Sequence, residues 1–230
     1  MKSLGTVSKT RNILGSSVQM PPAPIWPGSR DVKLTHPSWC PRHLKLRCFL
    51  GRTQRKGTDE MKETAEEYIK RMLGHVGGHD PLKLQAAAPK KIEKLLKGQP
   101  AAKLRKRPAP GKWSVQEIVA HLADTEIVGG WRMRLILGSP GTPITAFDQD
   151  TWVTACHYDK RDPRKCLEQF RVLREANLAL LKSLTPEQWR HHGMHSERGE
   201  ETIEHIARMF AGHDLNHIAQ IERILAPKKA

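Results

Sequence analysis

One stretch near the end of the chain constrains the fold more than any other, because its inward positions recur every three or four residues. These positions are Ile203, Ile206, Phe210, His213, His217, Gln220 and Ile224. Such spacing places all of these side chains on one face of an α-helix that packs against neighbouring helices. This face, here called the C-terminal stripe, becomes polar in its middle, where the core of a helical bundle should be driest.

The polar middle of the C-terminal stripe predicts a metal site. His213 and His217 are four residues apart, so their imidazoles lie one above the other on the same helix face. Burying such polar groups without partners costs about 1 to 3 kcal/mol each. A divalent cation would satisfy both rings, and two histidines at this spacing suit a single ion. The third ligand must then come from another helix, and His121 is the best candidate because it borders that helix's apolar face.

Local start and stop signals predict four long helices. Ser114 and Glu117 form a capping box, and Asp80-Pro81 and Asp162-Pro163 each supply a cap followed by a first-turn proline. The predicted long helices run from 80 to 98 with a bend at Pro89, from 114 to 138, from 162 to 184, and through the C-terminal stripe to about 226; a short helix is predicted at 59–74. With no strand pattern evident, the fold class is all-α, a four-helix bundle with a disordered N-terminal extension.

Charge and composition divide the chain into three parts. Residues 1–60 are basic and rich in proline and are predicted to be a disordered leader, or an overlong reading frame whose start is Met61. Residues 61–79 form a short helix and linker, and residues 80–226 form the bundle. The net charge of +15 lies entirely in the first 110 residues. We therefore expect no sequence-specific nucleic-acid binding by the bundle, although the leader could make nonspecific contacts.

Localisation follows from what the sequence lacks. No apolar run reaches the roughly 20 residues that cross a bilayer, and the N-terminus lacks the apolar core of a signal peptide. The four cysteines, Cys40, Cys48, Cys156 and Cys166, form no CxxC pair and are expected to be free thiols. These features predict a cytoplasmic protein with no membrane contact.

Other polar residues are weaker candidates. Asp124 and Gln220 each follow a predicted ligand by about one turn and are candidates for orienting ligands or for acid–base roles. Trp131 and Trp152 could line a pocket, and Arg132 with Arg134 could attract an anionic substrate, although packing and solvation are the more common roles of such residues. The remaining histidines are expected to be solvated or peripheral; these are His157, His191, His192, His195 and His205.

Three segments together resemble the DinB-like superfamily and its YfiT-like branch of metal-dependent hydrolases. They are GKWSVQEIVAHLADTE at 111–126, AFDQDTW at 146–152 and GHDLNHIAQIERIL at 212–225. The resemblance implies a four-helix bundle that can dimerise and that binds one divalent ion, zinc or nickel, through His121, His213 and His217. One position departs from many relatives, which carry a second histidine where this chain has Asn216.

Three neutral histidines leave one open position on a tetrahedral ion for water or substrate. The prediction is a metal-dependent hydrolase acting on a small molecule. A transferase that uses a low-molecular-weight thiol is the alternative enzyme, because the resemblance extends to such transferases and isomerases. A metal-stabilised binding or stress-response scaffold is the non-catalytic alternative.

Overall fold

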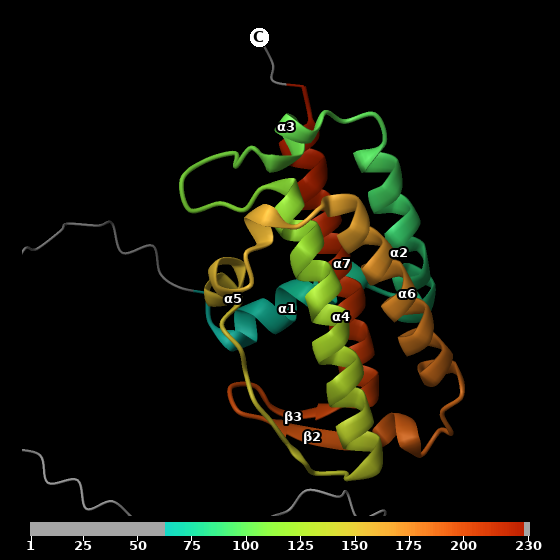
Figure 1. Cartoon of the computed structure of the whole chain (residues 1–230). Coiled ribbons are helices and arrows are strands. Elements are labelled where there is room, and N and C mark those ends of the chain that lie inside the picture. Colours follow the sequence, from blue (N-terminus) through green and yellow to red (C-terminus); the bar gives the residue numbers. More distant parts are fainter. Residues whose placement is uncertain (1–62, 228–230) are drawn as a thin grey trace, which may run out of the picture. The chain divides into compact units, whose positions relative to one another are not determined.

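The computed structural model describes residues 63–227, and four helices within them form a closed bundle (Figure 1). They are α2 (Pro81–Leu96), α4 (Val115–Gly138), α6 (Pro163–Lys182) and α7 (Ile203–Leu225). Helix α4 packs on α6, α6 on α2, α2 on α7, and α7 back on α4. The predicted all-α four-helix bundle is confirmed. The predicted leader at 1–60 lies outside the described residues.

The predicted start of α4 is a capping box. The Ser114 hydroxyl accepts from the backbone N–H of Glu117 at 3.3 Å, and the Glu117 carboxylate accepts from the backbone N–H of Ser114 at 2.7 Å. Both groups are buried, so the box satisfies amides that water cannot reach. It thereby fixes the residue at which α4 begins, two turns before His121.

The short N-terminal helix α1 (Ala65–Val76) lies across α7. Its contact with α7 is close because α7 presents Gly212 there: a Cβ at this position would lie 2.0 Å from the backbone oxygen of Met72. Arg71 on the same helix donates to the side-chain oxygen of Asn216 at 2.9 Å. Asn216 therefore helps to hold α1 on α7.

Short elements connect the bundle helices, and three of them are strands, contrary to the expectation of none. The helical connections are α3 (Ala101–Arg105), α5 (Gln149–Ala155) and the 3-10 turns η1 (Tyr158–Lys160) and η2 (Gln188–Arg190). The strands are β1 (Pro143–Ile144), β2 (His192–His195) and β3 (Gly199–Thr202). Strand β2 pairs parallel with β1 and antiparallel with β3. Segments this short carry too few residues for an alternating pattern to be recognised.

A buried arginine links all four bundle helices. Pro89 in α2 has no N–H, so the carbonyl of Gln85 loses its usual partner one turn ahead. Arg174 from α6 donates to that carbonyl at 2.9 Å. The same guanidinium binds Asp214 on α7 at 2.5 and 3.0 Å and Glu126 on α4 at 2.8 Å. These contacts fix the four helices relative to one another around a charged centre.

Candidate metal centre

Three histidines converge between α4 and α7, which lie side by side in the bundle (Figure 1). The Nε2 atom of His213 is 3.0 Å from Nε2 of His121 and 3.1 Å from Nε2 of His217. All three side chains are buried, with residue exposures of 1%, 8% and 6% for His121, His213 and His217. The structure thus brings together the three residues that the sequence singled out as ligands, one from α4 and two from α7.

Hydrogen bonds around the cluster indicate which ring nitrogens carry protons. Nδ1 of His217 lies 2.9 Å from the side-chain oxygen of Gln220. An amide oxygen only accepts, so this contact assigns the proton of a neutral His217 to Nδ1 and leaves a lone pair on Nε2. Thr125 donates its hydroxyl to the backbone oxygen of His121 at 2.8 Å and sits 3.4 Å from that ring's Nε2. Gln220 therefore orients one ring toward the centre of the cluster.

Burial keeps all three imidazoles neutral. It lowers the pKa of His121 and of His213 well below the ordinary value, and proximity of the other rings adds to the effect. Burial also lowers the pKa of His217 to about 4. A neutral imidazole is the form that coordinates a cation. The cluster is therefore ready to bind a metal ion at neutral pH without first losing protons.

The arrangement fits a cation better than it fits hydrogen bonding among the rings. Three Nε2 atoms face one another, and the contact of His217 with Gln220 leaves its Nε2 without a proton to share. Within residues 63–227, this is the one group of three or more histidine, cysteine or acidic side chains whose ligand atoms all lie within 4.8 Å of one another. Nδ1 of His213 is buried and has no hydrogen-bond partner in this part of the chain. Nε2 lone pairs that face one another in a buried site are what a divalent cation satisfies.

A tryptophan that the sequence reasoning passed over covers two of the rings. Trp113 lies against His121, with ring centroids 4.9 Å apart, and is stacked parallel to His217 at 6.2 Å. Its indole N–H donates to Asp150 of α5 at 3.0 Å. The signal that could have found it is its position directly before the capping box, where an apolar residue commonly packs back on the first turns of the helix.

The other candidate residues lie elsewhere. Asp124 points to Arg161 and accepts from it at 2.9 and 2.8 Å, so its carboxylate is engaged in an ion pair. Trp131 is 62% exposed, whereas Trp152 packs against Phe147 with ring centroids 4.5 Å apart. Within residues 63–227, Asp124 forms no hydrogen bond with the three rings and Trp131 forms no ring contact with them.

The Arg132 and Arg134 pair is divided between two sides of α4. Arg132 donates to the backbone oxygen of Thr145 at 2.6 Å, whereas Arg134 donates to Asn177 of α6 at 3.0 Å. The two guanidinium groups therefore do not form a joint anion site. A shared role would require both to lie on one helix face, which residues two apart on a helix do not.

The remaining histidines do not join the cluster. His205 lies 3.9 Å from the carboxylate of Glu201. His157 is exposed and adopts a left-handed backbone conformation, with φ of 50°. His195, expected to be solvated in a loop, is instead buried in β2 with 4% exposure, because its side chain lies on the inward face of the hairpin.

Comparison with known proteins places the chain in a family. The family model of the DinB superfamily matches residues 85–221. The chain belongs to the DinB superfamily. Among curated relatives, the "Putative metal-dependent hydrolase YfiT" of Bacillus subtilis (strain 168) is 29% identical over 115 residues, which are 50% of this chain and 65% of that protein. The "Putative metal-dependent hydrolase BH0277" of Halalkalibacterium halodurans is 24% identical over 141 residues, 61% of this chain and 82% of the relative.

The solved structure of YfiT from Bacillus subtilis, described as an unusual four-helix bundle, matches with a TM-score of 0.57 and 23% identity. The match covers 71% of this chain and 90% of YfiT. The predicted membership of the DinB superfamily and its YfiT-like branch is confirmed. None of the helices within residues 63–227 is long and apolar enough to cross a membrane.

Proposed function

We propose that this member of the DinB superfamily is a metal-dependent hydrolase that acts on a small molecule. The observation that carries the proposal is the convergence of three buried ring nitrogens, since Nε2 of His213 lies 3.0 Å from Nε2 of His121 and 3.1 Å from Nε2 of His217. The names of the curated relatives, which describe metal-dependent hydrolases, support the same reaction class. The chain spans 65% of the length of YfiT.

The proposed metal is zinc or nickel, held by the three histidine Nε2 atoms. Nitrogen ligands suit both ions, and a set of three leaves a coordination position for water or substrate. An ion bound there would act as a Lewis acid and lower the pKa of a bound water toward neutrality. The ligands carry no negative charge, so the full charge of the ion remains available to the reacting group.

The chain's own residues position this chemistry. Gln220 accepts the Nδ1 proton of His217 and so holds that ring with its lone pair directed at the ion. Trp113 packs on two of the three rings and, through Asp150, connects the site to α5. Asp124 is assigned no acid–base step, because its carboxylate is held by Arg161.

Free thiols in Cys156 and Cys166 agree with the proposed cytoplasmic location.

The test combines metal analysis with an activity assay. Purified protein is stripped with a chelator, reloaded separately with zinc and with nickel, and assayed with 4-nitrophenyl acetate and a panel of small amides and esters. We expect one equivalent of bound metal and hydrolysis that is lost on stripping and restored on reloading. Stoichiometric metal with no turnover on any member of the panel would favour the scaffold alternative.

A thiol-dependent transfer reaction is separated from hydrolysis by a second arm of the same assay. The loaded protein is incubated with 1-chloro-2,4-dinitrobenzene, with and without cysteine or glutathione. Hydrolysis proceeds without any thiol, whereas a transferase consumes the electrophile only when a thiol is present. Metal-dependent thiol conjugation in the absence of hydrolysis would replace the proposed reaction by the alternative.

A further inference from the structure

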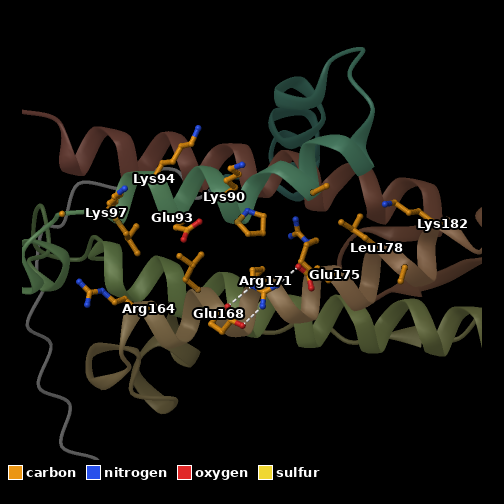
Figure 2. A pocket seen from close by; sticks show the side chains of 17 residues that line it. Lys90, Glu93, Lys94, Lys97, Arg164, Glu168, Arg171, Glu175, Leu178 and Lys182 are labelled. Carbon is orange, nitrogen blue, oxygen red and sulfur yellow. Dashed lines mark hydrogen bonds and ion pairs between the residues drawn. The ribbon is translucent and has the colours of Figure 1, made fainter.

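A groove lies between α2 and α6, two helices that contribute none of the three histidines. Figure 2 shows the groove between them, with Lys97 and Arg164 at one end and Lys182 at the other. The helices run antiparallel, since the end of α2 lies beside the start of α6. The groove encloses about 1170 Å³, and no part of the proposed hydrolase chemistry uses it.

The floor of this groove is apolar, and some of the side chains on its walls are small. Pro89 and Leu178 are buried, and Leu167 packs partly buried against the core. The exposed alanines Ala86 and Ala179 face the same space, one from each helix. Small side chains on both walls leave room for the apolar stripe of a ligand to reach the floor.

The rim of the groove carries excess positive charge. Lys90 and Lys94 of α2 and Lys97 directly after it line one side, and Arg164 and Lys182 of α6 line the other. Within residues 63–227, none of these five cations forms an ion pair. The acidic side chains in the groove offset only part of this charge. Arg171 pairs with both Glu168 and Glu175, so this trio keeps one negative charge, and Glu93 adds a second against the five rim cations.

We propose that the groove between α2 and α6 binds an acidic amphipathic helix of a partner protein. The apolar floor would receive the apolar stripe of that helix, and the rim cations would pair with its flanking carboxylates. Helix α2 has 16 residues, so the groove accommodates a helix of about four turns, roughly 24 Å long.

The distribution of charge selects this occupant over others. Cations spread along the whole length of the groove match a ligand charged along its length, whereas a lipid carries its charge at one end. Duplex nucleic acid would leave the apolar floor uncovered, because its binding surface is phosphate. The chain's own first 60 residues contain 11 basic and 3 acidic residues and therefore have the wrong charge for this groove.

The experiment measures fluorescence anisotropy of the full chain with two labelled peptides. One is an 18-residue amphipathic helix with a leucine stripe flanked by glutamates, and the other has lysine in place of each glutamate. We expect the acidic peptide to bind at least about tenfold more tightly than the basic one, and to weaken as salt is raised.

Two variants localise the binding. Lys90→Glu reverses a rim charge, and Ala179→Trp fills the groove from an exposed position. Each variant should bind the acidic peptide about tenfold more weakly, or weaker still. Lys91→Glu is the matched control, because Lys91 is the exposed neighbour of Lys90 and does not line the groove. Circular dichroism and bound-metal content should be unchanged in all three variants.

Four results would overturn the proposal. They are equal binding of the two peptides, equal loss of binding in Lys90→Glu and Lys91→Glu, tighter binding of anionic vesicles or duplex DNA than of the acidic peptide, and self-association in sedimentation that Ala179→Trp abolishes. The last would identify a second copy of the chain as the occupant. None of these outcomes depends on whether the histidine cluster is catalytic.

Discussion

The side-chain oxygen of Gln220 accepts a hydrogen bond from Nδ1 of His217 across 2.9 Å, one turn along the same helix. This contact fixes the ring and its tautomer, so that Nε2 faces His213 with a lone pair. Gln220, which forms no hydrogen bond with His121 or His213 in the described part of the chain, thereby decides whether Nε2 of His217 can coordinate an ion.

Replacing Gln220 should weaken metal binding without unfolding the protein. Gln220→Leu removes the acceptor, which lets the His217 ring rotate or change tautomer, and we expect metal affinity to fall by about 10- to 100-fold. Gln220→Glu keeps an acceptor and adds charge, so it should retain or increase affinity. Competition with a chromogenic zinc chelator measures both. Equal affinity in wild type and Gln220→Leu would show that the contact does not orient the ligand.

Each of the three histidines should be needed for binding. His121→Ala, His213→Ala and His217→Ala each remove one of the converging Nε2 atoms, and we expect bound metal to fall from one equivalent to below about a tenth, since a two-ligand site is weak. Elemental analysis of purified protein is the measurement. His205→Ala is the control, because His205 lies beside Glu201 outside the cluster. Full metal occupancy in His121→Ala would show that α4 contributes no ligand to the site.

Metal-free protein should lose stability as the pH falls. Burial lowers the pKa of His217 to about 4, and it also lowers those of His121 and His213, below the value of about 6.5 for an unfolded chain. The unfolded state therefore binds more protons between about pH 6.5 and 4, and stability decreases there by up to about 1.4 kcal/mol per pH unit for each histidine. Urea unfolding in the presence of a chelator at several pH values tests this. In His217→Gln the dependence of the unfolding free energy on pH should become shallower, by the contribution of one titrating group.

Removing the buried guanidinium should destabilise the bundle strongly. Arg174→Met leaves Asp214 and Glu126 without their cation and the Gln85 carbonyl without a donor, and breaking such a buried pair costs about 3 to 5 kcal/mol. Chemical denaturation gives the free energy of unfolding. Arg171→Met, one helical turn away and paired only with exposed glutamates, should change it by less than about 1 kcal/mol. Similar losses in both variants would argue against the linking role of Arg174.

The contact of α1 with α7 should depend on a glycine. In Gly212→Ala the new Cβ would meet the backbone of Met72 at 2.0 Å, so α1 must move away, at a cost of about 1 to 3 kcal/mol. Gly138→Ala is the control, because a Cβ there has no neighbour within 4 Å. Thermal unfolding of both variants distinguishes a specific close contact from a general effect of glycine replacement.

Much of the fold could be predicted because it is encoded locally. The capping box at Ser114 and the proline after Asp162 act within one turn, and the structure begins α4 and α6 at these positions. The strand containing His195 could not be recognised, since its four residues become a strand only through pairing with β1 and β3. Trp113 was missed for a similar reason, because its stacking on His217 depends on α7, about a hundred residues further along the chain.

The sequence by itself determined where the long helices begin and that His213 and His217 lie one turn apart on an apolar stripe, because helical geometry follows from neighbours within four residues. Only the tertiary structure decided that His121 meets them, that Arg174 binds groups on α2, α4 and α7, and that α2 and α6 enclose a cationic groove. These relations depend on how helices distant in sequence are rotated and packed against one another, which side-chain packing across the whole bundle sets.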